Sequence, residues 1–161
     1  MRNIAFLALI FGAFIFTTSC KKIEEPTALN VIENAGTATI NGVAFANSDL
    51  GEPGNEFAKA GTKLTVVINP ASFPGATTYT GNNNLLVYTT TVGANGQWSV
   101  TVKAPKAQIN ATIASDDYRQ DLINTATTPT TVISEDKIWI LQLTPVTVWE
   151  GNTTEIDITF N

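Results

Sequence analysis

The sequence predicts an all-β protein, a single seven-stranded Greek-key β-sandwich that follows an N-terminal signal peptide. Three observations predict this class. Apolar and polar residues alternate along several short segments, which is typical of strands buried on one face. Gly, Asn and Pro residues that form turns separate these segments. From residue 37 onward, no apolar pattern with helical spacing is sustained.

The predicted strands follow from that alternation, taken in chain order: 37–46, 63–69, 85–92, 97–103, 107–115, 137–143 and 154–160. In the first predicted strand, the apolar positions shift by one residue at Asn41-Gly42, where we expect a β-bulge. The second alternates cleanly and ends at Pro70. The third and fourth flank Asn95-Gly96, a strong hairpin signal. The fifth places Ile109, Ala111 and Ile113 on one face.

The C-terminal strands differ in character. The sixth is apolar on both faces, so we expect a central, well-covered position. Pro145 interrupts the chain after it, so residues 146–149 are expected at an edge or a corner. Glu150-Gly151-Asn152 predicts a second hairpin, and the last strand points Ile156, Ile158 and Phe160 inward.

Composition excludes several functions. The chain has 161 residues, with 9 Lys plus Arg against 14 Asp plus Glu, no His and one Cys. This net charge of −5 does not suit nucleic-acid binding, which needs a basic face. Without His, imidazole-based catalysis is excluded, and a lone Cys forms neither an intrachain disulfide nor a Cys-based metal cluster. We therefore expect no enzyme activity, no cofactor and no nucleic-acid partner.

The N-terminus predicts export. Arg2 precedes an apolar run over residues 4–16, which is too short to span a bilayer. Small polar residues and the single cysteine, Cys20, follow. This segment resembles the lipobox of Bacteroidetes-type bacterial lipoproteins, although Thr17 stands where Leu is usual. The alternative is an ordinary signal peptide with an incidental Cys.

The lipobox resemblance implies that residues 1–19 are removed and that Cys20 carries the lipid that anchors the chain in the bacterial outer membrane. Residues 20–36 lack periodicity and are predicted to form a flexible tether, and residues 37–161 to form the sandwich. The resemblance leaves the cell surface and the periplasmic face both open.

Three motifs lie in order along the folded part: residues 37–43, 60–66 and 94–102. Together they resemble the carboxypeptidase regulatory-like domain, a transthyretin-like (prealbumin-like) sandwich. Long insertions at 47–60 and 116–136 depart from the shortest members of that family. The resemblance implies an accessory binding module without catalytic residues.

Two acidic groups are candidate metal sites. Asp116, Asp117 and Asp121 offer the oxygen ligands that Ca²⁺ prefers, but their spacing is not that of an EF-hand loop. A solvated turn with a local ion pair to Arg119 explains them better. Asp49, Glu52 and Glu56 form a second group, which fits a solvated loop better than a metal or partner contact.

Two aromatic residues, Trp149 and Tyr79, are candidate ligand contacts, because an exposed ring stacks on sugars or on a partner protein. Packing under a loop is the alternative for each. Trp98 and Trp139 fall in strand alternation and are expected in the core.

These observations favour a non-catalytic outer-membrane lipoprotein that presents a β-sandwich to a glycan or to other envelope proteins. The alternative is a structural subunit of the fimbrial or adhesin type that assembles by strand exchange, with residues 154–160 as the donor.

Overall fold

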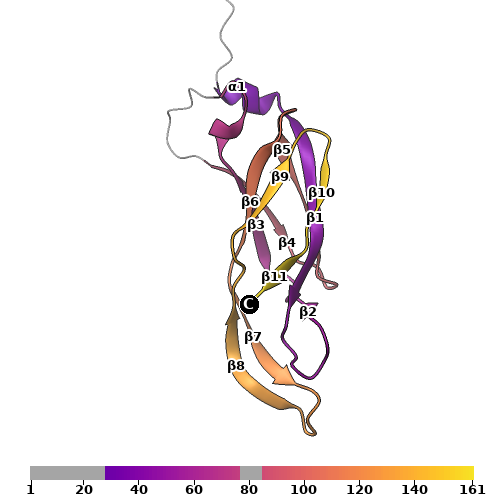
Figure 1. Cartoon of the computed structure of the whole chain (residues 1–161). Coiled ribbons are helices and arrows are strands. Elements are labelled where there is room, and N and C mark those ends of the chain that lie inside the picture. Colours follow the sequence, from indigo (N-terminus) through magenta and orange to yellow (C-terminus); the bar gives the residue numbers. More distant parts are fainter. Residues whose placement is uncertain (1–27, 77–84) are drawn as a thin grey trace, which may run out of the picture.

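The computed structural model describes residues 28–76 and 85–161, which form two packed β-sheets and a projecting two-stranded ribbon (Figure 1). The predicted β-sandwich is confirmed. The elements are α1 (Ala28–Glu33), β1 (Gly36–Ala46), β2 (Glu56–Phe57), β3 (Lys63–Ile68), a 3₁₀ turn (Pro70–Ser72), β4 (Leu86–Thr91), β5 (Gln97–Ala104), β6 (Ile109–Ser115), β7 (Tyr118–Asn124), β8 (Thr131–Trp139), β9 (Thr144–Val148), β10 (Thr153–Glu155) and β11 (Ile158–Phe160). In this described part, no helix is long and apolar enough to cross a membrane.

The first sheet is built around β1. Strands β5 and β2 run antiparallel to β1 and pair with two successive stretches of it, residues 36–43 and 45–46. Strands β10 and β11 run parallel to β1. The first strand of the sandwich therefore lies beside the last, which brings residues about 114 positions apart, such as Ala44 and Ile158, into register.

The second sheet has the strand order β4-β3-β6-β9 and is antiparallel throughout. One hydrophobic core fills the space between the two sheets, with side chains such as Ile40, Leu64 and Val102 fully covered. Phe73, which follows the 3₁₀ turn, is also fully buried, although the alternation pattern does not reach it.

Neither predicted hairpin is a hairpin in the structure. The Asn95-Gly96 turn joins β4, in the second sheet, to β5, in the first. Likewise, Glu150-Gly151-Asn152 joins β9 to β10 and so crosses between the sheets. The glycines serve the turn in both settings, since Gly96 has φ +70° and Gly151 has φ +76°.

The predicted bulge at Asn41-Gly42 is also wrong. β1 keeps an unbroken register with β5, and Ala38, Ile40, Ala44 and Ala46 all face the core. The break lies instead in the neighbouring strand, where Ile156 and Asp157 separate β10 from β11.

The predicted central, well-covered strand over 137–143 is also wrong. Its first half ends β8, and among the described residues β8 pairs with β7 alone, in a ribbon at the end of the sandwich opposite α1 (Figure 1). Ile138, Ile140 and Leu143 are exposed, whereas Trp139 is buried at the base of the ribbon. There, Tyr118 stacks on Trp139 at 6.4 Å between ring centroids and meets the edge of Phe160 at 5.1 Å.

The N-terminal end of the described chain is ordered before the predicted boundary at residue 37. Val31 and Ile32 of α1 pack against the core, and Lys103 Nζ donates to the carbonyl oxygens of Glu33 and Ala35 at 3.1 and 3.0 Å. The end of the predicted tether is thus part of the folded domain.

Candidate functional site

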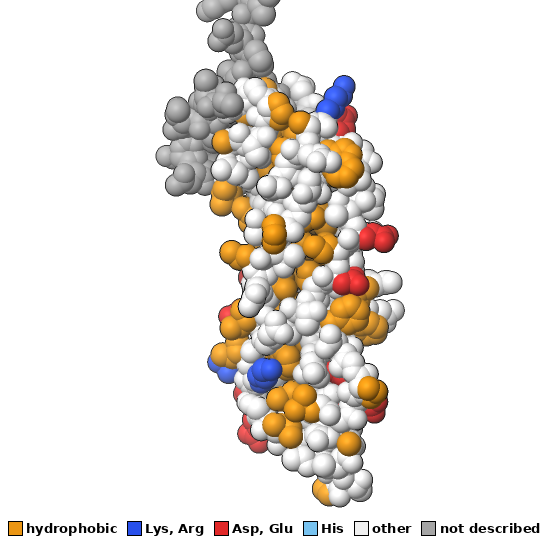
Figure 2. Space-filling view, in the orientation of Figure 1, with side chains coloured by type: hydrophobic (Ala, Val, Ile, Leu, Met, Phe, Trp, Pro, Cys, Tyr) orange, Lys and Arg blue, Asp and Glu red, His pale blue; other side chains and the backbone are white. Residues whose placement is uncertain are grey.

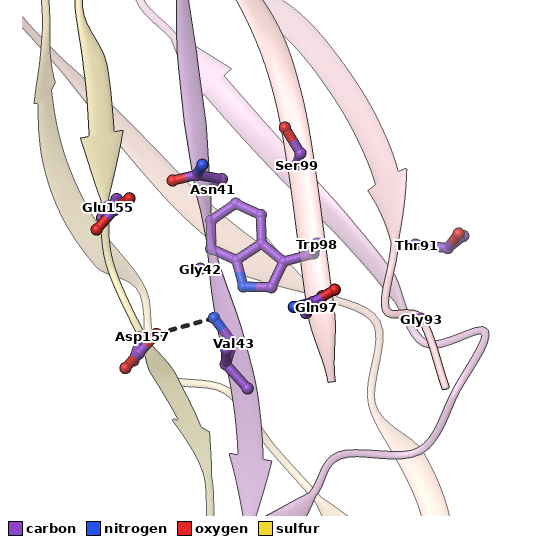
Figure 3. Close-up of a pocket in the computed structure, with 10 residues that line it drawn as sticks. All are labelled: Asn41, Gly42, Val43, Thr91, Gly93, Gln97, Trp98, Ser99, Glu155 and Asp157. Carbon is purple, nitrogen blue, oxygen red and sulfur yellow. Dashed lines mark hydrogen bonds between the residues drawn. The ribbon is translucent and has the colours of Figure 1, made fainter. Parts of the chain in front are cut away.

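A cleft of about 640 Å³, in which most lining residues are polar, lies on the first sheet, where β5, β1 and the β10–β11 segment run side by side (Figure 3). Its lining residues are Asn41, Gly42, Val43, Thr91, Gly93, Gln97, Trp98, Ser99, Glu155 and Asp157. None of them is Lys or Arg. Their carboxylates accept hydrogen bonds, and their amides and hydroxyls both donate and accept them, which suits an uncharged polar ligand.

Strand register explains why these side chains gather. Asn41 pairs with Ser99 on one side and with Glu155 on the other. Val43 likewise pairs with Gln97, and its backbone N–H binds the side chain of Asp157. Because side chains alternate along a strand, these residues share the outer face of the sheet.

Gly42 shapes the cleft from the middle of β1. A Cβ at this position would overlap the carbonyl oxygen of Ile156 and would lie 2.6 Å from its carbon. This close approach lets Ile156 N–H donate to the Asn41 carbonyl oxygen at 2.9 Å. It also lets Val43 N–H donate to Asp157 Oδ1 at 2.8 Å. Glycine therefore holds Asp157 at the cleft.

Two polar atoms at the cleft have no hydrogen-bond partner among the described residues. One is Asn41 Oδ1 and the other is Trp98 Nε1, and both are buried. Trp98 is only 4% exposed, and the β1–β5 register pairs it with Gly42, so its indole lies on the core side of β1 and not on the face that carries Asn41. Buried polar groups are nearly always paired, so both atoms are exceptions.

The acidic candidates for a metal site are not brought together. Asp121 Oδ1 accepts from the backbone N–H of Asp136 at 2.9 Å within the ribbon. Asp116 and Asp117 instead line a smaller cavity of about 290 Å³ with Lys59 and Lys63. Among the described residues, no group of three or more acidic, His or Cys side chains is placed to hold a metal ion.

The small cavity also contains buried hydroxyls. Thr62 and Tyr118 line it, and Thr62 Oγ1 has no hydrogen-bond partner within the described ranges. Burial raises the pKa of the Tyr118 hydroxyl, because the phenolate would lose its hydration. Tyr118 is thus a neutral group at the cavity wall.

The second acidic group has a structural use. Glu56 Oε2 accepts from the backbone N–H groups of Ser48 and Asp49 at 2.6 and 2.9 Å. Asp49 is buried, and its Oδ1 accepts from Gly51 N–H at 2.8 Å and Thr125 N–H at 3.0 Å. Hydrogen bonds from Thr125, chiefly, and from Gly51 lower the pKa of Asp49. Glu56 therefore ties the 47–60 insertion to itself, and Asp49 fastens it to the ribbon.

The remaining candidates lie away from the cleft or outside the described residues. Trp149 follows β9 and is half-buried, so its contact with a ligand stays a prediction. Tyr79 and Cys20 fall outside the described ranges. Sequence reasoning missed the cleft because Asn41, Gln97 and Asp157 are far apart in the chain and none belongs to a recognisable motif.

No protein-family model and no curated protein sequence matches the chain. Among solved structures, the chain is similar to the shaft pilin SpaA of Lactobacillus rhamnosus GG, with 12% identity and a TM-score of 0.41. That match covers 78% of this chain, which spans about half (49%) of the pilin. A match to the major plantain pollen allergen Pla l 1 has 9% identity and a TM-score of 0.35, covering 78% of this chain and 93% of the allergen.

Proposed function

We propose that this chain is a non-catalytic lipoprotein of the bacterial outer membrane whose transthyretin-like sandwich binds a hydroxyl-rich ligand, such as a glycan, in the cleft on the first sheet. The cleft carries the proposal. It combines carboxylates (Glu155 and Asp157), amides (Asn41 and Gln97) and no cationic side chain. Its volume lies within the range of small-molecule sites.

The chemistry of the cleft supports a glycan over an anionic ligand. Sugar hydroxyls donate to carboxylate and carbonyl oxygens and accept from N–H groups, so they match the carboxylates and amides of the cleft lining. An anionic ligand would instead face two carboxylates without a compensating Lys or Arg among the lining residues. We therefore expect neutral oligosaccharides to bind better than phosphorylated or sulfated ones.

The position of α1 supports presentation away from a membrane. Cys20 precedes Ala28 by eight positions, a stretch that spans at most about 28 Å when extended. A lipid on Cys20 would therefore hold the α1 end near the membrane, and the ribbon at the opposite end would face away (Figure 1). The three motifs that resemble the carboxypeptidase regulatory-like domain fall on or next to β1, β3 and β5, strands of the sandwich.

Titration by NMR tests the binding proposal. Neutral oligosaccharides added to the isotope-labelled mature chain should shift the amide signals of Asn41, Gln97 and Asp157. Asn41→Ala should weaken binding about tenfold, because it removes the amide group of a residue that lines the cleft. Asn110→Ala is the matched control, since Asn110 is exposed on the other sheet. No shift at the cleft, or an equal effect of both variants, would overturn the proposal.

Protease added to intact cells tests the membrane face. Loss of the protein while a periplasmic control survives would place the sandwich at the cell surface. Survival until the outer membrane is broken would place it in the periplasm, and a role in envelope assembly would then replace surface capture.

The alternative, a fimbrial or adhesin-type subunit that assembles by strand exchange, has a structural requirement. The candidate donor, residues 154–160, occupies β10 and β11 and pairs with its own β1. Exchange would require this segment to leave β1 and enter another chain. Detergent-resistant ladders on a gel would support the alternative, and their absence from native cell extracts would count against it.

A further inference from the structure

The edges of the two sheets differ in how they are protected from pairing with other strands. An unprotected edge strand offers free N–H and C=O groups to another chain, and proteins usually block it with charge, Pro or a bulge. On the second sheet, β9 carries Pro145, and the Thr147 carbonyl oxygen accepts from Thr154 Oγ1 at 3.1 Å. These features block the β9 edge.

Three further edges carry protecting features. On β5, Lys103 N–H donates to Tyr88 Oη at 3.1 Å. On the opposite edge of that sheet, β10 and β11 are interrupted and carry Glu155 and Asp157 nearby. In the ribbon, β8 contains three consecutive charged residues, 135–137, and Asp136 has φ +50°, which breaks the regular strand.

Strand β4 has none of these devices. It is the terminal strand of its sheet, and all six of its residues pair with β3 without a register shift. It contains no charged residue, Pro or Gly. Within the described ranges, no strand pairs with its outer edge. In a regular antiparallel strand, every second residue directs its N–H and C=O away from the existing partner, so β4 is open to a further strand.

We propose that β4 is a self-association edge, at which a second copy of this chain pairs antiparallel through β4 about a two-fold axis. The absence of charge favours a second copy, because no register places like charges opposite one another. With the axis at Val87, that residue faces the partner's Val87, and Leu86 faces the partner's Tyr88. Aliphatic and aromatic–aliphatic pairs of this kind stabilise neighbouring strands.

The exposed side chains of β4 fit pairing with a second copy of the chain. Val87 is 57% exposed, so its side chain is accessible to a partner strand. The visible face of the molecule has few charged side chains, and apolar ones recur along its length (Figure 2). Edge pairing buries little surface, so we expect a weak dimer that a shared membrane would favour by raising the local concentration.

Cross-linking of the full chain in its native cells tests the proposal independently of the cleft. Val87→Cys treated with a short bis-maleimide should give a dimer. The parent chain controls for Cys20, and Leu143→Cys is the matched control because Leu143 is 71% exposed in another part of the molecule. A Val87→Cys dimer yield no greater than that of Leu143→Cys would overturn the proposal.

A charge-swap experiment gives a second readout that does not depend on cysteine geometry. Val87→Lys places two ammonium groups face to face across the axis, so co-purification of two differently tagged chains should fall about tenfold. Pairing Val87→Lys with Val87→Glu should restore it. Equal recovery from the Lys–Lys and Lys–Glu pairs would contradict self-association through β4. Because Val87 is exposed, each variant is expected to fold.

Discussion

Replacement of Gly42 by Ala should destabilise the sandwich strongly, because the space of its side chain is occupied by backbone. The new Cβ would overlap the Ile156 carbonyl and would lie 2.6 Å from its carbon. The β10–β11 segment would have to move away from β1. That movement would lengthen two hydrogen bonds. One runs from Ile156 N–H to the Asn41 carbonyl oxygen, at 2.9 Å, and the other from Val43 N–H to Asp157 Oδ1, at 2.8 Å.

The magnitude follows from those losses. A neutral hydrogen bond contributes about 0.5–1.5 kcal/mol, and a bond to a charged group more. Overpacking costs about 1–3 kcal/mol. We expect the free energy of unfolding to fall by about 3–5 kcal/mol, and Tm by about 8–15 °C. Urea denaturation monitored by tryptophan fluorescence measures the first quantity, and calorimetry the second.

Gly36→Ala is the matched control on the same strand. Its Cβ would also meet a neighbour, but that neighbour is the side chain of exposed Glu150, which is free to rotate away. The expected cost is below about 1 kcal/mol. If Gly42→Ala and Gly36→Ala unfold at the same urea concentration, the close approach of Ile156 to β1 does not exist as described.

Three further predictions concern other parts of the molecule. Phe73→Ala should lower the free energy of unfolding by about 3–5 kcal/mol, because removal of a fully buried ring leaves a cavity. Urea titration measures this change, and a loss below about 1 kcal/mol would place Phe73 at the surface. Tyr88→Phe should cost about 0.5–1.5 kcal/mol by removing the acceptor for Lys103 N–H, and a neutral result in the same titration would contradict that bond. The lowered pKa of Asp49 stabilises the fold above its ordinary pKa of 3.8, and this contribution is lost as the pH falls through the lower folded-state pKa. The stability difference between parent and Asp49→Asn should therefore shrink below about pH 4, and a difference that grows there would refute the assignment.

Local alternation was sufficient to locate several strands. Residues 63–69 and 97–103 are predicted within one residue of β3 and β5, because these strands expose one face and bury the other. Alternation reports burial only, so it does not say which sheet a strand joins. A Gly turn has similar chemistry in a hairpin and in a sheet crossing, so both crossings were predicted as hairpins.

Two errors have specific causes. In β1, the inward positions after Ile40 are Gly42, Ala44 and Ala46, whose small side chains are a weaker apolar signal than the half-buried Val43 and Phe45. That contrast mimics a change of parity. In the 137–143 segment, exposed Ile138, Ile140 and Leu143 mimic a strand covered on both faces.

The cleft could not be predicted from the sequence for a topological reason. Its walls come from β1, β5 and the β10–β11 segment, and parallel pairing of the first strand with the last brings them together. No local pattern encodes a pairing between residues so far apart. The sequence also does not distinguish Gly42, which a close strand contact requires, from a glycine in a turn.

Lipid anchorage is tested by mass spectrometry of the N-terminal peptide from the mature protein. We expect a peptide that begins at Cys20, lacks residues 1–19 and carries acyl chains on its cysteine, with the acylation lost in Cys20→Ser. A mature chain that begins elsewhere, or one that retains Cys20 as a free thiol, would contradict it.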